Sequence, residues 1–470
     1  MGRTQSVTWE LRAAFARRLA AMYGREVPAY ETLVEVTREI NAEVVGRDRD
    51  GAQRLGSVER VSAERHGAIR VGTPRELAQA ARIFGAFGMH PVGFYDLRDT
   101  GPGAVPVVST AFRPIDSAEL ARNPFRVFTS MLVVDDPRYF AAGTQARLQA
   151  SLAERVLFAP ELLVLADRAA AEGGLPSDAA EELLQQATAA FALSREPVDR
   201  AWYDHLDAIS SVAADIGGVP TTHLNHLTPR VLDIDALQAR MRARGVEMID
   251  EIQGPPGWEG PDVLLRQTSF RALAEERVFR YPDGSVRTGA LRVRFGEVEQ
   301  RGIALTPRGR TLYDRMVAEA DVRGGGADGA RGVWRRHLPA TERGLAEHGL
   351  AFFTYRVAGP AQARAASVSA LVGSGAIVPE PIVYEDFLPR SAAGIFRSNL
   401  AGEGTRDEGR TAPEYDLARL AGVLGATVHD PMDLYAAQQD ASLRAAAHEL
   451  GVRIVPGRPD EHDLSRSLTS

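Results

Sequence analysis

The sequence predicts an α+β protein in which strands from distant parts of the chain carry candidate metal ligands. Residues 222–230 read as a strand with a histidine, an amphipathic helix follows over 233–244, and a short apolar run follows at 246–249. Two other segments, 64–70 and 295–301, have the same extended character and supply a further histidine and three glutamates. A histidine on a strand that opens such a β–α–β unit is one way in which an open sheet holds a catalytic metal.

Composition narrows the chemistry that the chain can perform. Its 470 residues are 44% hydrophobic and 25% charged, which is ordinary for a soluble globular protein with a large core. There is no cysteine and no lysine, so every basic side chain is an arginine. Disulfides, thiolate nucleophiles, iron–sulfur clusters, Schiff-base chemistry and a Walker A lysine are therefore excluded. Any metal must be held by His, Asp, Glu or backbone oxygen.

Charge and hydropathy exclude two classes of partner. The formal net charge is -7 with the two signs interspersed, so the chain offers no basic stripe to nucleic acid. No apolar run approaches the ~20 residues that span a bilayer. The charged N-terminal segment does not resemble a secretory signal. We expect a cytoplasmic protein that binds neither nucleic acid nor membrane.

The N-terminal half combines predicted helices with predicted strands. Apolar residues recur at helical spacing over 8–46, and a helix is predicted from Pro74 to Phe87 because proline suits a first helical turn. Strand-like runs follow at 91–97, 104–112 and 125–134. Residues 137–216 are rich in Ala, Leu and Glu at helical periods, so we predict a mainly helical insertion there.

The C-terminal half continues the sheet and ends in helices. Strand patterns are predicted at 263–265, 278–281, 291–299, 352–357 and 377–384, and helices at 312–320, 413–423 and 431–450. The glycine-rich segment 323–330 is predicted to be a flexible loop within one fold, because strand signals return after it. The polar tail after Pro459 is expected to be frayed. We therefore predict a single domain over residues 1–470.

Alternation along the strands selects candidate ligands but leaves two choices open. In a strand over 222–231, His226, Thr228 and Arg230 share one face, whereas His223 lies on the other. The two histidines cannot serve one metal unless the strand is bulged. Glu297 and Glu299 share a face of their strand, so alternation does not choose between them.

The segment with the other histidine also carries an arginine. His66 and Arg70 share a face if 64–70 is a strand, so the planar guanidinium could bind a carboxylate near the metal or form an ordinary surface ion pair. Together the three segments offer two imidazoles and one carboxylate. That is the ligand set of a non-heme Fe(II) site with open positions.

Longer motifs in the chain resemble one family, the bacterial 2-oxoadipate dioxygenase/decarboxylases. The resemblance runs nearly end to end and in order, over 64–73 (ERHGAIRVGT), 124–130 (PFRVFTS), 226–230 (HLTPR), 264–270 (LLRQTSF), 294–302 (RFGEVEQRG), 384–389 (YEDFLP) and 391–396 (SAAGIF). It implies a vicinal-oxygen-chelate-like curved β-sheet core around a metal, with helical N-terminal, inserted and C-terminal segments.

The resemblance also implies a ligand set. The motif GEVEQR is similar to the C-terminal strand of 4-hydroxyphenylpyruvate dioxygenase, in which the ligand glutamate lies three residues before a Gln-Arg pair. This likeness implies Glu297 as the carboxylate ligand. Asn225-His226-Leu227 is similar to the strand that opens the second module there, which implies His226, and His66 completes the set by family pattern.

Substrate-binding residues are implied in the same way. Arg70 would clamp a carboxylate of the substrate. The turn that contains Arg390 and Ser391 would lie close to the substrate. Arg390 departs from the smaller apolar residue that the family pattern leads us to expect, so it would alter the preferred substrate or point to solvent.

The implied reaction uses Fe(II) to convert 2-oxoadipate and O2 to 2-hydroxyglutarate with loss of two CO2, as in bacterial lysine breakdown. Three alternatives stay open: a glyoxalase-like lyase or isomerase, a non-catalytic metal or small-molecule binding protein, and a hydrolase that uses Asp or Glu with water. Oxygen uptake on addition of 2-oxoadipate distinguishes the dioxygenase from these alternatives. The sequence does not decide the exact 2-oxo acid, the oligomeric state, the metal in purified protein or the product stereochemistry.

Overall fold

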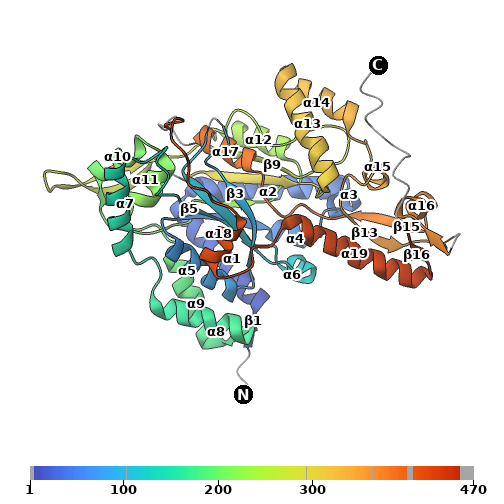
Figure 1. Cartoon of the computed structure of the whole chain (residues 1–470), viewed down its shortest axis with the longest axis horizontal. Coiled ribbons are helices and arrows are strands. Elements are labelled where there is room, and N and C mark those ends of the chain that lie inside the picture. The colour runs from blue at the N-terminus through green and yellow to red at the C-terminus, as the bar shows by residue number, and fades with distance from the viewer. Residues whose placement is uncertain (1–4, 102, 293, 362–363, 400–405, 456–470) are drawn as a thin grey trace.

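The computed structural model describes residues 5–101, 103–292, 294–361, 364–399 and 406–455, whose arrangement is shown in Figure 1. The tail after Pro459, for which we predicted fraying, lies outside these ranges. Helices and strands are mixed throughout, as predicted, and the sheets formed by the described residues do not close into a barrel. Within the same ranges, every helix is too short or too polar to cross a membrane.

A central sheet positions the candidate ligands. Its strands, in spatial order, are β3 (His90–Asp96), β4 (Val107–Arg113), β5 (Arg126–Leu132), β2 (Arg65–Val71) and β8 (His226–Pro229). Among neighbouring strands of this sheet, only β2 and β5 are paired in parallel. A bridge between Arg230 and Glu299 sets the antiparallel pair β12 (Gly296–Arg301) and β9 (Leu265–Phe270) beside β8. The sheet therefore continues past its fifth strand.

Alternation along these strands separates two hydrophobic cores. Ile69 and Val71 of β2 belong to one core, whereas Ala68 belongs to the other. In β5, Val127 packs on the first side and Phe128 on the second. Because side chains alternate along a strand, His66 and Arg70 share the face of Ala68. Both faces are covered, which explains why nearly every residue of β2, β4 and β5 is buried.

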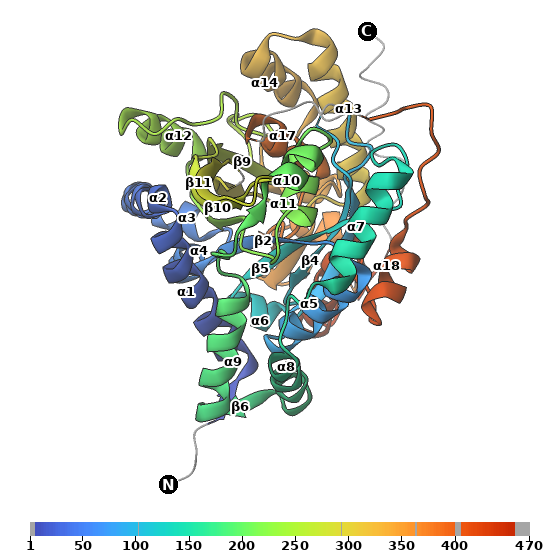
Figure 2. The ribbon, with the colours of Figure 1, turned by 90° about the vertical axis from the view of Figure 1, so that its left-hand side faces the viewer.

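The N-terminal helices cover the first face. The predicted helical region 8–46 is confirmed as α1 (Thr8–Glu26) and α2 (Pro28–Arg47), which separate at Val27 because Pro28 occupies a first helical turn. The helix predicted from Pro74 is confirmed as α5 (Pro74–Ala86). Figure 2 shows α1 and α5 below the central strands, on the side opposite α10 and α11. Short helices complete this part: α3 (Arg49–Gln53), α4 (Val58–Ala63), α6 (Ser117–Arg122) and α12 (Ile234–Ala243).

Residues 137–216 are mainly helical and contribute to both faces. They contain α7 (Ala142–Glu154), α8 (Pro160–Glu172), α9 (Ser177–Ala190), α10 (Arg200–Asp207) and most of α11 (Ser211–Gly217), with short strands β6 (Gly174–Pro176) and β7 (Val198–Asp199). Buried residues of α8 and α9 belong to the first core, and those of α7, α10 and α11 to the second. Strand β6 pairs with β1 (Gln5–Val7), which ties the insertion to the N-terminus.

Most of the C-terminal part covers the second face, which carries the candidate ligands, whereas Leu420 and Leu424 belong to the first core. Its strands are β10 (Glu275–Arg280), β11 (Val286–Leu291), β13 (Phe353–Val357), β14 (Ala365–Ala366), β15 (Ile377–Pro381) and β16 (Arg453–Ile454). Its helices are α13 (Pro307–Arg323), α14 (Gly326–His337), α15 (Glu342–Glu347), α16 (Val368–Gly373), α17 (Pro389–Asn399), α18 (Leu417–Leu424) and α19 (Pro431–Leu450). The helix predicted over 431–450 is confirmed to the residue.

Three sequence expectations were wrong in detail. The segment 323–330 is not one loop, because α14 begins at Gly326 and only Gly324 and Gly325 separate it from α13. The expected strand 291–299 is broken between β11 and β12, where the buried side chain of Arg294 binds Glu26 and Glu275. Strand β8 has only four residues, and the run 246–249 forms only an isolated bridge through Met248.

Candidate metal centre

Three side chains from three neighbouring strands converge on one buried point. His66, His226 and Glu297 each offer a ligand atom, and these atoms lie within 4.8 Å of one another. Nε2 of His66 is 3.6 Å from Oε2 of Glu297, and Nε2 of His226 is 3.4 Å from Oε1 of the same carboxylate. The structure therefore brings together the three residues that the family resemblance implied.

The strand register explains the convergence. On β2 and β8, His66 pairs with Thr228 and Ala68 pairs with His226, so the two histidines are diagonal neighbours on one sheet face. The parallel bridge between residues 230 and 299 aligns β12 with β8, and Glu297 then lies beside Thr228. The ligand atoms are close because the register is fixed by pairing along three strands.

His223, the alternative to His226, points into a different polar cluster. Its Nε2 lies 3.3 Å from Oδ1 of Asp215 and 3.2 Å from Nδ2 of Asn225. Among the described residues, it is not part of the group around Glu297. The alternation argument does not apply to His223, because β8 begins only at His226. The contacts of His223 nevertheless separate it from the ligand group.

Glu299, the alternative to Glu297, occupies the same strand face but contacts the other nitrogen of His66. Its Oε2 lies 2.9 Å from Nδ1 of His66, and Arg301 donates two hydrogen bonds to the carboxylate, at 2.8 and 2.9 Å. Burial would raise the pKa of Glu299, but Arg301 and His66 lower it to about 2. Glu299 is thus an ionised group beside the ligand set.

The two imidazoles have different electrostatic surroundings. Burial lowers the pKa of His226 to about 4, although the Glu297 carboxylate acts in the opposite direction. Burial also acts to lower the pKa of His66, but Glu299 and Glu297 outweigh it and raise that pKa above its usual value. His226 is therefore neutral at neutral pH, the form in which imidazole binds a metal.

The environment of these groups fits a divalent metal. Nδ1 of His226 lies 3.0 Å from Oγ1 of Thr228, and Gln267 donates a 3.1 Å hydrogen bond to Oε2 of Glu297, so two of the three ligands are oriented by a neighbour. Nε2 of His66 is buried without a hydrogen-bond partner among the described residues. A buried, unpaired ring nitrogen is costly unless something binds it, and a metal would satisfy it.

Arg70 lies four residues along β2 from His66, on the same face and buried. Its Nη1 donates to Oδ2 of Asp215 on α11, and Asn225 donates a 2.8 Å hydrogen bond to the same oxygen. The predicted arginine is therefore held in the interior by a carboxylate from the helical insertion. It is not a surface ion pair, which was the alternative from sequence.

The segment 389–394, expected to be a turn, is instead the start of α17, and its residues Arg390 and Ser391 lie in different environments. Arg390 is 69% exposed at its side chain and binds Asp321 of α13 at 2.7 Å. Ser391, the next residue, is buried. The structure thus separates them, with only Ser391 pointing to the interior.

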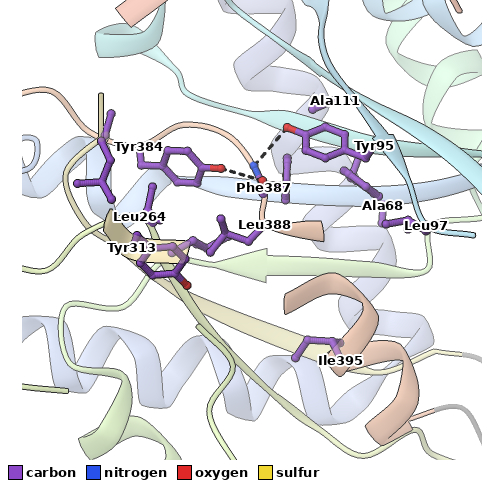
Figure 3. Close-up of a cluster of buried hydrophobic side chains, with 14 of the residues drawn as sticks. Ala68, Tyr95, Leu97, Ala111, Leu264, Tyr313, Tyr384, Phe387, Leu388 and Ile395 are labelled. Carbon is purple, nitrogen blue, oxygen red and sulfur yellow. Dashed lines mark hydrogen bonds between the residues drawn. The ribbon is translucent and has the colours of Figure 1, made fainter. Parts of the chain in front are cut away.

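An aromatic cluster walls one side of the ligand group. The ring of Phe387 meets the imidazole of His66 edge-on, with centroids 5.0 Å apart, and also contacts Phe128. Figure 3 shows how the backbone of Phe387 is fixed: its N–H donates to the hydroxyl of Tyr95, and its carbonyl accepts from Tyr384. Apolar rings of this kind exclude water from a polar site and strengthen its electrostatic interactions.

Comparison with known proteins decides the family. Residues 15–399 match the family model described as 2-oxoadipate dioxygenase/decarboxylase. A Mycobacterium bovis protein named 2-oxoadipate dioxygenase/decarboxylase is 56% identical over 91% of this chain and 96% of that protein. The chain belongs to the 2-oxoadipate dioxygenase/decarboxylase family. The resemblance seen in the sequence motifs is therefore confirmed.

Solved structures of this family share the fold. The Pseudomonas putida hydroxyglutarate synthase, determined in complex with 2-oxoadipate, has a TM-score of 0.79 and 38% identity, with 95% of this chain and 99% of that chain covered. A Shigella flexneri protein also has a TM-score of 0.79, with 36% identity over 94% of this chain and 99% of that chain. The likeness thus extends over nearly the whole fold of a family member.

Sequence reasoning missed the groups that orient the candidate ligands. The sequence around Asp215 shows only an acidic residue in an apolar helix, which does not indicate a role in the site. Its contact with Arg70 depends on how α11 packs against β2. Phe387 was seen only as part of a family motif. Thr228 was on the correct face by alternation, but its contact with His226 could be read only from the strand pair.

Proposed function

We propose that this chain is an Fe(II)-dependent enzyme that converts 2-oxoadipate and dioxygen to 2-hydroxyglutarate. The observation that carries the proposal is the convergence of His66, His226 and Glu297 in a member of the 2-oxoadipate dioxygenase/decarboxylase family. Two imidazoles and one carboxylate leave coordination positions open for a substrate and dioxygen. The name and bound compound of the Pseudomonas putida neighbour agree with this substrate and product.

Atom balance corrects the expected stoichiometry. 2-Oxoadipate has six carbons and 2-hydroxyglutarate has five, so one CO2 leaves in each turnover and not two. The oxygen atoms also balance, because dioxygen adds the two atoms that CO2 removes. The reaction therefore needs no second 2-oxo acid and no external reductant.

The proposed ligand atoms are Nε2 of His66, Nε2 of His226 and a carboxylate oxygen of Glu297. When bound, the metal would polarise the 2-oxo acid as a Lewis acid and activate dioxygen, while the 2-oxo acid supplies the electrons that reduce dioxygen. The chain supplies the geometry. Thr228 and Gln267 orient two of the three ligands, which reduces the reorganisation needed during reaction.

Arg70 is proposed to bind a carboxylate of the substrate. It lies on the sheet face of the ligands, and a planar guanidinium suits a carboxylate. Asp215 and Asn225 restrict its movement, so the carboxylate would be held at a fixed distance from the metal ligands. Correct orientation of a bound reactant can contribute on the order of 7 kcal/mol to catalysis.

The start of α17 is proposed to complete the substrate site. Ser391 is buried and offers a hydroxyl. Arg390 would have to leave Asp321 before it could reach a substrate, so its predicted contact demands a side-chain rearrangement. Phe387 is proposed to keep water away from His66.

The finer fold assignment and the physiological setting are part of the same proposal. A vicinal-oxygen-chelate-like curved sheet is supported by the way β2, β8 and β12 each present one ligand from one face. A role in lysine breakdown and a cytoplasmic location accompany the proposed substrate.

An oxygen-electrode assay tests the proposed reaction. The protein is loaded anaerobically with Fe(II), and 2-oxo dicarboxylates of increasing chain length are added with oxygen. We expect the fastest uptake with 2-oxoadipate, with one 2-hydroxyglutarate and one CO2 formed for each O2. Turnover of the 2-oxo acid without oxygen uptake would indicate a lyase or isomerase. Bound iron with no turnover of any 2-oxo acid would indicate a binding protein, and either result would overturn the proposal.

A further inference from the structure

We propose that Glu299 is a positioning residue that fixes the imidazole of His66 so that its Nε2 faces the metal. This inference rests on the metal site proposed above. The two ring nitrogens of His66 meet different carboxylates of one strand face: Nδ1 lies 2.9 Å from Glu299, and Nε2 lies 3.6 Å from Glu297. All three side chains are buried.

Glu299 cannot move freely, because arginines hold both of its oxygens. Arg301 donates from Nε to Oε1 and from Nη2 to Oε2, a paired arrangement that fixes the plane of the carboxylate. Arg126 donates to Oε1 at 3.4 Å. Arg301 is itself anchored, since its Nη1 donates to the carbonyls of Tyr384 and Asp386. The carboxylate is thus a rigid reference point for the ring.

A carboxylate at Nδ1 selects one form of the imidazole. It favours the proton on Nδ1, which leaves the lone pair of Nε2 free for a metal and makes that nitrogen more basic. The contact is at ion-pair distance but is not yet an aligned hydrogen bond, and contacts of this kind commonly tighten when the ligand binds. His226 has the weaker Thr228 hydroxyl at the same position, so the two histidines are not equivalent.

A neighbouring glutamate provides a matched control for a merely structural role. Glu64 binds Arg126 and Arg230 at 2.8 Å each and lies 3.5 Å from Arg301, and its side chain is as deeply buried as that of Glu299. Of these two glutamates, only Glu299 contacts a histidine among the described residues. Both glutamates contact Arg126 and Arg301. Of the two, Glu64 also binds Arg230, whereas Glu299 also contacts His66.

The affinity of the protein for a metal distinguishes a positioning role of Glu299 from a merely structural role. Purified wild type, Glu299→Gln and Glu64→Gln are titrated with Co(II) alone in competition with a chelator of known affinity, and thermal unfolding is followed without added metal. We expect Co(II) binding about 10- to 100-fold weaker in Glu299→Gln and close to wild type in Glu64→Gln, with both variants destabilised. Equal Co(II) affinity in the two variants would overturn the positioning role. Absence of Co(II) binding by wild type would instead overturn the proposed function on which the inference rests.

A measurement on the wild type keeps the inference testable if the glutamine variants do not fold. The protein is labelled with ¹⁵N-histidine and loaded with Zn(II), and the protonation of each ring nitrogen is read by NMR. We expect both metal-shifted histidines to carry their proton on Nδ1 and to bind through Nε2. A metal-shifted histidine that binds through Nδ1 would contradict the proposal.

Discussion

Asp215 on α11 and Arg70 on β2 form an ion pair in the interior, although they are 145 residues apart in the chain. Both side chains are almost fully buried, at 2% and 4% exposure. The helical insertion therefore does more than cover the sheet: it carries the carboxylate that holds the proposed substrate-binding arginine. Several expectations follow from this pair and from the ligand group beside it.

Replacement of Arg70 should weaken substrate binding more than it slows chemistry. Charged hydrogen bonds contribute about 1.5–3 kcal/mol each, so we expect Arg70→Ala to raise KM for 2-oxoadipate about 10- to 100-fold. Arg70→Lys keeps the charge but not the planar fork, and we expect an intermediate KM. Steady-state kinetics measures both. Wild-type-like turnover of Arg70→Ala at low substrate concentration would remove Arg70 from this role.

The contribution of Asp215 to stability should disappear in acid. Burial would raise the pKa of Asp215, but His223 and Arg70 lower it well below its usual value. A lowered carboxyl pKa stabilises the fold above the unfolded-state pKa of about 3.9, and this stabilisation is lost as pH falls. Asp215→Asn should therefore unfold with a free energy lower by on the order of 3 kcal/mol at neutral pH.

Urea unfolding at several pH values checks the Asp215 expectation. The difference between wild type and Asp215→Asn should stay constant from neutral pH to about pH 4 and narrow below it. A difference that persists unchanged at the lowest pH at which both proteins fold would show that the charge of Asp215 is not what stabilises the pair.

Substitution of His226 should remove metal binding, whereas substitution of His223, three residues away, should not. His226 faces Glu297, whereas His223 faces Asp215, and both are 4% exposed. Loss of one of three ligands should abolish tight binding, so we expect His226→Ala to retain little Co(II) after dialysis and His223→Ala to retain a full equivalent. Metal analysis of the dialysed proteins decides this. Equal metal content in the two variants would refute the proposed ligand set.

Substitutions of Ser391 and of Arg390, at the start of α17, should have different effects on KM for 2-oxoadipate. Exposed ion pairs contribute about 0–1 kcal/mol, and Arg390 pairs with Asp321 at the surface. We expect Arg390→Ala to leave KM for 2-oxoadipate within about fivefold and Ser391→Ala to raise it more. A larger effect at Arg390 would support the sequence-based prediction that it contacts the substrate.

The site was predictable from sequence only as far as local periodicity reaches. The sequence predicted the bounds of α19, which begins at Pro431 and is followed by Gly451. Alternation did not apply to His223, because β8 begins only at His226. Alternation could not choose between Glu297 and Glu299, because they share a face. That choice depends on the register between β12 and β8, which is a tertiary property.

Other features were hidden for the same physical reason. The contact between Arg70 and Asp215 requires α11 to pack against β2, and no residue near Asp215 signals this partner. In the break between β11 and β12, Arg294 binds Glu275 of β10 and also Glu26, which lies 268 residues away in the chain. Local patterns predict elements well, but buried charges are paired by the fold as a whole.

The location of iron in the protein tests the central claim most directly. Crystals of protein loaded anaerobically with Fe(II) are measured at the iron absorption edge, and the anomalous map locates the metal. We expect one strong peak about 2.0–2.2 Å from Nε2 of His66, Nε2 of His226 and a carboxylate oxygen of Glu297, by analogy with metal–ligand distances elsewhere. A peak at any other group, or full iron occupancy without contact to one of these three residues, would contradict the account.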